Sequence, residues 1–324
     1  MKPTTQRDQR NLLFKVARAY YEDDLTQNQI GQRFGLSRIK ISRLLSQARD
    51  EGIVHISLNI PDDEHIDIER ALETKFGLHE VLISHTTSDD PESIRNDLGV
   101  TAANCLMRTL RGEEIVAINW GGTLLALVEA LQSPTGAPIR DWTKIKIVQS
   151  LGGVGSPEAD VYSAGLVHRI ARTFGAKARI LAAPGIVSSA TIRKELLADK
   201  QISNTIELAA KADIALMGIG QFTPSSAVMQ SNILSTREYE ELLALNVVGD
   251  IGLRFFDANG LCIDHEINER VLGLTLDQIT KIPRAIGVAG GSEKFNSILA
   301  ALKGKLINVL VTDVNTAIKL METT

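Results

Sequence analysis

The segment from Leu25 to Arg49 constrains the fold of this chain most strongly. It carries five basic residues and no acidic residue, the basic ones being Arg33, Arg38, Lys40, Arg43 and Arg49. Two helical patterns, at 26–34 and 37–49, meet at Gly35, where a glycine can end the first helix in the left-handed conformation. Two short helices joined by such a turn are typical of a helix-turn-helix.

The second predicted helix separates apolar from polar side chains. Ile41, Leu44, Leu45 and Ala48 follow the i, i+3, i+4, i+7 spacing of a buried stripe. The other side carries groups that can bond base edges or phosphates, and Thr26 and Ser37 are suited to cap the two helices. The residues predicted to contact DNA are Thr26, Gln27, Ser37, Arg38, Lys40, Arg43 and Gln47. The alternative is a solvated basic helix, but charge, caps, turn and spacing together favour the DNA-binding motif.

The charge of the chain is unevenly distributed. The overall net charge is −4, yet residues 1–60 contain ten Lys and Arg against six Asp and Glu, a net charge of +4. The remaining residues contain 25 against 33, a net charge of −8. This asymmetry restricts the expected binding of a polyanion to the N-terminal part.

The sequence also indicates where the N-terminal part ends. A helical pattern at 7–23 can pack on the helix-turn-helix, and the alternation at 53–60 predicts a strand or wing. An acidic run after Pro61 opens a further helix that Gly77 ends. We therefore expect a winged helix-turn-helix DNA-binding domain at 1–60, a linker helix at 61–77 and a larger domain at 78–324. The linker helix carries an apolar stripe that could pack against a partner subunit.

Short β-rich runs alternate with longer helical patterns from residue 80 onward. The predicted strands are 81–84, 115–119, 145–151, 178–182, 214–218, 251–257, 285–289 and 308–312. The helices expected between them include 92–110, 124–131, 160–174, 236–245 and 293–302. This alternation predicts an α/β fold with a doubly wound, mainly parallel sheet covered by helices on both faces.

Four glycine-bearing loops are expected at one edge of this sheet, at 119–123, 151–155, 218–221 and 290–294. Ligands of open parallel sheets bind beyond the carboxyl ends of the strands, where glycines let the backbone approach an anion. Any one of these loops could be only a tight turn; four together suggest a polar pocket. In the last of them, Lys294 opposes the helix dipole, a position that a bound phosphate or carboxylate would explain. An exposed lysine offset by Glu293 explains it equally well, so both alternatives remain open here.

The chain shows no convincing catalytic or metal-binding pattern. Asp250 and Arg254 could bond sugar hydroxyls and an anion, or form a salt bridge at a strand end. His265 and Glu266 could act as an acid and base, but their polar turn favours a surface role. The histidines lack metal-ligand spacing, and there is no P-loop or nucleophile elbow. We therefore predict no catalytic residue, no metal and no cofactor.

The cysteines and the hydrophobic pattern indicate the expected compartment. Cys105 and Cys262 are far apart and have neither metal-ligand nor redox spacing. The N-terminus lacks the apolar core of a signal peptide, and no run approaches the roughly 18 apolar residues of a membrane span. We expect a cytoplasmic protein with no membrane partner.

Several motifs carry a resemblance to a known family. These are LSRIKISRLLSQARDEGIVHI at the helix-turn-helix, followed by NWGGTL, GDIGLRFFDANG, AGGSEK and LINVLVTDVNTA. In this order, over nearly the whole chain, they resemble the SorC family of sugar-responsive bacterial transcription regulators. One difference is that Gly252, the second glycine of GDIGLRFF, stands one position earlier than in the family pattern.

The resemblance implies a sensor fold and a set of ligand contacts. It implies that 78–324 is a sugar-binding effector and oligomerisation domain with the fold of sugar-phosphate isomerases and glucosamine-phosphate deaminases, used without catalysis. It further implies dimers or tetramers that respond to a sugar phosphate, a polyol or a free sugar. The implied effector contacts are Gly121, Gly122, Thr123, Gly152, Gly153, Gly220, Gln221, Asp250, Arg254 and Lys294.

The sequence thus predicts a regulator that binds double-stranded operator DNA and is controlled by a small carbohydrate-type effector. Two alternatives remain at this point. One is a sugar-phosphate isomerase or deaminase fused to a DNA-binding head, and the other is a constitutive architectural DNA-binding protein whose large domain only oligomerises.

Overall fold

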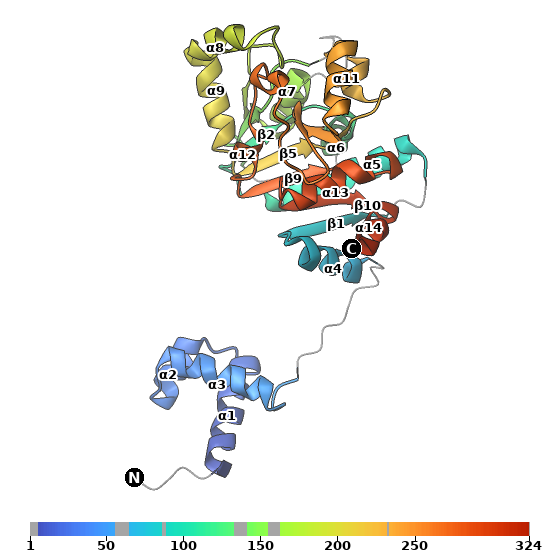
Figure 1. Ribbon diagram of the computed structural model, residues 1–324. Coiled ribbons are helices and arrows are strands. Elements are labelled where there is room, and N and C mark those ends of the chain that lie inside the picture. Colours follow the sequence, from blue (N-terminus) through green and yellow to red (C-terminus); the bar gives the residue numbers. More distant parts are fainter. Residues whose placement is uncertain are drawn as a thin grey trace. The chain divides into compact units, whose positions relative to one another are not determined.

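The structure is a computed structural model that describes residues 6–55, 65–85, 89–132, 141–154, 163–231 and 233–323. The chain forms two compact units, Met1–Asp63 and Glu64–Thr324 (Figure 1). Each unit has its own hydrophobic core.

The first unit is a three-helix head. Its helices are α1 (Gln6–Tyr21), α2 (Gln27–Phe34) and α3 (Arg38–Asp50). Gly35 adopts a φ of 64° after α2, as the turn requires. The predicted stripe of α3 is buried against Leu13 and Val16 of α1 and Ile30 of α2, its members being Ile41, Leu44, Leu45 and Ala48. The helix-turn-helix prediction is confirmed.

The strand or wing predicted at 53–60 is wrong in the part that the structure describes. The amides of Ile53 and Val54 both donate to the carbonyl oxygen of Ala48, at 2.8 and 3.1 Å. These residues therefore complete the end of α3 and pack on the head core instead of extending as a strand. Residues 56–60 lie outside the described residues.

The second unit is built on a seven-stranded, all-parallel sheet of order β1-β10-β9-β5-β2-β3-β4. Its strands are β1 (Glu80–Ser84), β2 (Ile115–Ile118), β3 (Lys146–Gln149), β4 (Lys177–Arg179), β5 (Ile214–Gly218), β9 (Arg284–Val288) and β10 (Val309–Asp313). Seven of the eight predicted strands correspond to these. The continuous apolar runs arise because the central strands are buried on both faces.

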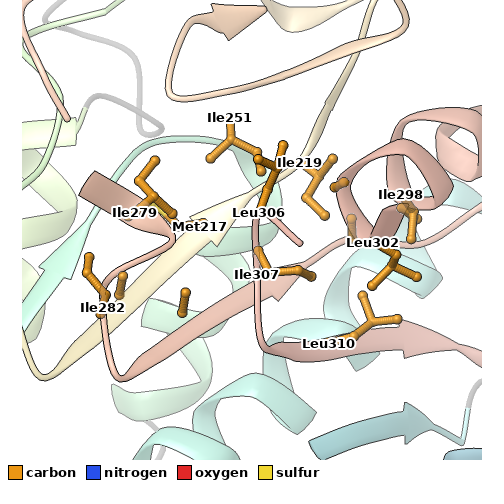
Figure 2. Close-up of a cluster of buried hydrophobic side chains, with 14 of the residues drawn as sticks. Met217, Ile219, Ile251, Ile279, Ile282, Ile298, Leu302, Leu306, Ile307 and Leu310 are labelled. Atoms are coloured by element: carbon orange, nitrogen blue, oxygen red, sulfur yellow. The ribbon is translucent and has the colours of Figure 1, made fainter. Parts of the chain in front are cut away.

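Helices cover both faces of this sheet, as predicted. One face carries α5 (Pro91–Thr109), α6 (Gly122–Gln132) and α7 (Ser163–Phe174), which share a core with the strands. The other face carries α4 (Ile66–Phe76), α9 (Lys200–Ala210), α12 (Leu276–Ile279), α13 (Phe295–Lys303) and α14 (Val314–Glu322). The helix α8 (Ala190–Ala198) packs on α9. Figure 2 shows the core on this face, in which Ile298 and Leu302 of α13 lie near Leu310 of β10, while Met217 of β5 lies near Ile279 of α12.

Residues 251–257 do not form a strand of the main sheet, which corrects that prediction. They contribute to a small antiparallel sheet of β6 (Gly220–Gln221), β7 (Gly249–Ile251) and β8 (Arg254–Phe256). The two-residue turn between β7 and β8 places both Gly252 and Leu253 at a φ of 61°, as a type I′ hairpin requires. This small sheet, α10 (Ala227–Gln230), α11 (Thr236–Ala244) and the 3₁₀ turn η1 (Glu266–Glu269) are inserted between β5 and β9.

The helix α4 belongs to the second unit and protects the exposed edge of the sheet. Leu72 is fully buried in the core of that unit. The carboxylates of Glu69 and Glu73 accept hydrogen bonds from the amides of Ile83 and Val81 in the edge strand β1, at 2.8 and 3.0 Å. Unpaired edge amides invite association with other strands, so the two carboxylates suppress this.

Candidate functional site

The order of the strands creates a natural crevice between β2 and β5. From β2 the chain proceeds through β3 to β4 at one edge, whereas from β5 it proceeds through β9 and β10 toward the other edge. The loops that follow these neighbouring strands therefore diverge, and ligands of open α/β sheets bind at this switch point. A cavity lies here, lined by Asn119, Trp120, Gly121, Gly122, Thr123, Leu124, Gly218, Ile219, Gly220, Ala227, Val228, Asp250, Gly252 and Lys294.

The N-terminus of α6 forms one wall of this cavity. Gly121 has a φ of 131°, which turns the chain from β2 into the helix. The first amide of this helix with an intrahelical acceptor is that of Leu125, which donates to Gly121 at 3.0 Å. The amides of Gly122, Thr123 and Leu124 are thus left at the positive end of the helix dipole. Such a terminus is suited to bind a phosphate or a carboxylate.

Lys294 adds a positive charge to the same cavity. It ends the 3₁₀ turn η2 (Ser292–Lys294) directly before α13 and is partly buried, whereas Glu293 is exposed. Burial lowers the pKa of the Lys294 ammonium, the charge of Asp250 opposes this, and the charge of Arg95 reinforces it. A second anion in the cavity would stabilise the charged ammonium, as a bound phosphate does.

Asp250 and Asn119 supply an acceptor and a donor. Asp250 is only 5% exposed, and its Oδ2 accepts from the amide of Leu253 at 3.0 Å. Its Oδ1 has no hydrogen-bond donor among the described residues. Asn119 accepts from the amide of Gly218 at 3.1 Å through Oδ1, which leaves its Nδ2 as a donor. Such paired groups can bond the hydroxyls of a ligand.

Asp250 also stabilises the turn beside the cavity. Leu253 adopts a φ of 61° despite its side chain. A left-handed conformation costs roughly 1–2 kcal/mol for such a residue. The hydrogen bond to Asp250 and the full burial of Leu253 offset this cost.

Arg95 also lies at the start of α6, although no sequence motif predicts it. A Cβ atom on Gly122 would lie 3.3 Å from both Cδ and Nε of Arg95, so this side chain runs past the start of α6. The approach depends on Gly99, one turn later in α5, where a Cβ would lie 2.5 Å from the backbone of Ala126. Arg95 is exposed and has no ion-pair partner in the part of the chain that the structure describes. Only the packing of α5 on α6 reveals it, and no local motif could have done so.

Gly152 and Gly153 lie away from this cavity. The amide of Gly152 donates to Leu272, and a Cβ at this position would lie 2.4 Å from the carbonyl oxygen of Pro184. The amide of Gly153 donates to Ala183 at 2.8 Å. Both glycines allow backbone segments to approach closely, and neither lines this cavity.

Arg254 and Gln221 also make contacts outside the cavity lining. The buried guanidinium of Arg254 donates to the carbonyl oxygens of Leu274, Asn268, Val271 and Gly273, and burial lowers its pKa to about 10. It ties a loop to the small sheet, does not line the cavity and forms no strand-end salt bridge within the described residues. Gln221 donates to Glu293 at 3.0 Å and to Thr223 at 3.3 Å.

We expect Asp250→Asn to stabilise the protein in a pH-dependent manner. Burial raises the pKa of Asp250 from 3.8 to about 6, so the folded state binds more protons than the unfolded state between these values. The stability of the native protein therefore falls as the pH rises through this window, by up to roughly 3 kcal/mol. Thermal unfolding at pH 4 to 7.5 should show that the melting temperature of the variant exceeds that of the native protein increasingly toward neutral pH. A difference in melting temperature that does not change with pH would contradict a buried Asp250 with a raised pKa.

We expect Gly220→Ala to displace Asp250 and weaken the effector response. The new Cβ would lie 2.1 Å from Oδ1 of Asp250, and overpacking of this kind typically costs about 1–3 kcal/mol. The matched control is Gly165→Ala in α7, where a Cβ meets nothing within 4 Å. Thermal unfolding with and without effector should distinguish the two, and equal behaviour would remove Gly220 from the cavity wall.

The head presents a separate polar face. Thr26 caps α2 in a reciprocal capping box with Gln29, and Ser37 caps α3 by accepting from the amide of Lys40. Arg38, Lys40 and Arg43 are exposed, and none has an ion-pair partner in the described part of the head. Gln47 is partly exposed and donates to Glu51 at 2.7 Å.

Three of the predicted DNA contacts lie around one hollow of the head. Thr26, Gln27 and Arg38 line it together with Tyr20 and Asn28, which the sequence analysis had not included. Exposed cations, amides and hydroxyls of this kind are the groups that bind a phosphate backbone or read base edges.

The structure gives less support to the other candidate catalytic and metal-binding residues. His265 caps η1 through Nδ1, and its Nε2 lies 3.4 Å from Glu241, outside the cavity lining. In the described part of the chain no cluster of three or more His, Cys, Asp or Glu side chains could hold a metal ion. No helix among these residues is long and apolar enough to cross a membrane.

Comparison with known proteins covers both units. Residues 62–322 match the family model described as "Putative sugar-binding domain", and residues 15–51 match the model for "Sigma-70, region 4". The "Deoxyribonucleoside regulator" of Bacillus subtilis (strain 168) is 32% identical over 311 residues, which cover 96% of this chain and 97% of that protein. The "Transcriptional regulator LsrR" of Enterobacter sp. (strain 638) is 34% identical over 309 residues, covering 94% of this chain and 91% of that protein.

A solved structure shows the same architecture over nearly the full length. The crystal structure of the full-length sorbitol operon regulator SorC from Klebsiella pneumoniae aligns with a TM-score of 0.74 and 31% sequence identity. The alignment covers 98% of this chain and all of that one.

Proposed function

Because the chain belongs to the SorC family of sugar-responsive bacterial transcription regulators, we propose that its effector is a phosphorylated sugar or polyol. The observation that carries this is the composition of the cavity at the switch point. The N-terminus of α6 and Lys294 form an anion-binding half, while Asp250 and Asn119 form a half that bonds hydroxyls. A sugar or polyol phosphate has both kinds of group.

The proposed contacts to the phosphate are Gly121, Gly122, Thr123 and Lys294, with Arg95 at the entrance. Asp250 and Asn119 bond the hydroxyls, and Gly220 keeps space for Asp250. Gly152, Gly153, Gln221 and Arg254 are left out of this set because their side chains or amides contact other parts of the protein.

DNA binding is assigned to the head, with Arg43 and Gln47 directed to base edges and Arg38 and Lys40 to phosphates. In this proposal the protein acts in the cytoplasm as a homodimer or homotetramer, and the effector changes the affinity for the operator. Control requires that the effector bind one arrangement of the oligomer more tightly than another, with a coupling of about 1–3 kcal/mol. Half-sites about 34 Å apart make DNA binding sensitive to such an arrangement.

A thermal-shift screen of the full-length protein tests the proposal. Matched pairs of free and phosphorylated sugars and polyols are compared, with inorganic phosphate alone as a control. A ligand at 100 times its dissociation constant should stabilise the unit that binds it by about 2.7 kcal/mol. We expect a shift with a phosphorylated compound and none with its free counterpart. A shift with free compounds alone would overturn the anion assignment, and turnover of any compound would point to the enzymatic alternative.

A further inference from the structure

Ile39 is the most exposed of the large apolar side chains in the described part of the chain, at 69%. It is the second residue of α3 and takes no part in the core of the head. Single exposed apolar residues are common on protein surfaces. Ile39 differs from these in its position, since the first residues of the second helix of a helix-turn-helix contact base edges in the major groove.

Ile39 and Arg43 lie together at the centre of the outward face of α3. A helix turns by about 100° per residue, which places both side chains roughly opposite the buried stripe of Ile41, Leu44, Leu45 and Ala48. Four residues separate them, so they are neighbours on the surface. An aliphatic group and a guanidinium are therefore presented side by side.

The charges around Ile39 favour a polyanion such as DNA over a basic partner. Its neighbours Arg38 and Lys40 are exposed, as is Arg43, and no acidic side chain occurs between Leu25 and Arg49. Such a surface repels a basic partner and attracts a polyanion. In the major groove the apolar group is the C5-methyl of thymine, which aliphatic side chains contact.

We propose that Ile39 reads a thymine methyl group in the operator. The inference rests on the proposed DNA-binding function of the head, and it names one base that the head recognises. Ile39 and Arg43 are separated by about 6 Å along α3, while base pairs are about 3.4 Å apart. The thymine therefore lies within about two base pairs of the base that Arg43 contacts.

Selection from a duplex library with a randomised core tests this inference. Full-length native protein, Ile39→Ala and Ile39→Val are each allowed to select sequences, and the base preferences are compared. In the best duplex of the native protein, each thymine is then replaced by deoxyuridine, which lacks only the methyl group. Because Ile39 is exposed and outside the core, both variants should fold normally, and their unfolding curves check this.

We expect one thymine per half-site to be preferred by the native protein and by Ile39→Val, and not by Ile39→Ala. Deoxyuridine at that position should weaken binding of the native protein about fourfold per half-site, the value for one buried methyl-sized group. The same replacement should leave the affinity of Ile39→Ala unchanged. The position should lie within about two base pairs of the base whose preference Arg43→Ala removes.

Identical base preferences and identical sensitivity to deoxyuridine in Ile39→Ala would overturn the inference. A changed oligomeric state of Ile39→Ala with unchanged base preference would also overturn it and assign Ile39 to a protein contact. Failure of the native protein to select any sequence would instead contradict the proposed function of the head.

Discussion

Replacement of Lys294 by methionine should greatly weaken the response to a phosphorylated effector and leave operator binding intact. Methionine keeps much of the length and apolar character of the lysine stem but removes its charge. A hydrogen bond to a charged group contributes about 1.5–3 kcal/mol, which corresponds to a loss of roughly tenfold to 150-fold in effector affinity. Lys294 lies in the second unit, whereas the proposed DNA contacts lie in the first, so the affinity for DNA without effector should not change.

The experiment measures operator binding by fluorescence anisotropy at increasing effector concentration. The matched control is Lys303→Met, which removes the same charge from an exposed position at the end of α13. Lys303→Met should respond like the native protein. A normal response of Lys294→Met would remove Lys294 from the phosphate site, and loss of DNA binding without effector would indicate a structural defect.

Replacement of Arg43 by alanine should weaken operator binding and relax the preference for one base in each half-site. A bidentate contact of arginine to guanine discriminates by about 1–3 kcal/mol. The loss should thus be about fivefold to 150-fold at that position, and the variant should approach its affinity for unrelated DNA. Arg43 is exposed and is not paired with a carboxylate in the described part of the head, so its removal should not unfold α3.

Lys40→Ala is the matched control for the Arg43 variant. Lys40 is proposed to contact a phosphate, so its loss should weaken binding uniformly across sequences and reduce the salt dependence by about one counterion. Affinities are measured against the selected duplex and against single-base changes at several salt concentrations. If Arg43→Ala weakens all sequences equally, Arg43 contacts the backbone only.

The helix-turn-helix could be predicted in detail because its signals are local. The caps at Thr26 and Ser37, the left-handed Gly35 and the buried stripe of α3 are properties of a few consecutive residues. The parallel strands could be predicted equally well, since strands that are buried on both faces have continuous apolar runs. The strand predicted at 251–257 was wrong because two successive residues with positive φ fold it into a hairpin, and the sequence provides a glycine at only one of them.

The candidate cavity was predicted in part. Loops that follow parallel strands must lie at one edge of the sheet, which brought Gly121, Gly122, Thr123, Gly220 and Lys294 into consideration. The sequence does not state which of these loops are neighbours. That depends on strand order, which places the loops after β2 and β5 side by side and directs the loop with Gly152 elsewhere.

The two-part organisation, the helix-turn-helix and the mainly parallel α/β class could be predicted from the amino-acid sequence, because helix periodicity, capping and strand burial act over short distances along the chain. Only the tertiary structure decided which polar groups meet at the cavity. In the folded chain, Asn119 and Asp250 line the cavity together with the start of α6. Arg95 lies near the same helix start because Gly99 allows α5 to approach Ala126 closely. The guanidinium of Arg254 instead donates to backbone carbonyl groups outside the cavity lining. The physical reason is that a binding site is a set of distances between segments far apart in sequence, and those distances are fixed by strand order and helix packing.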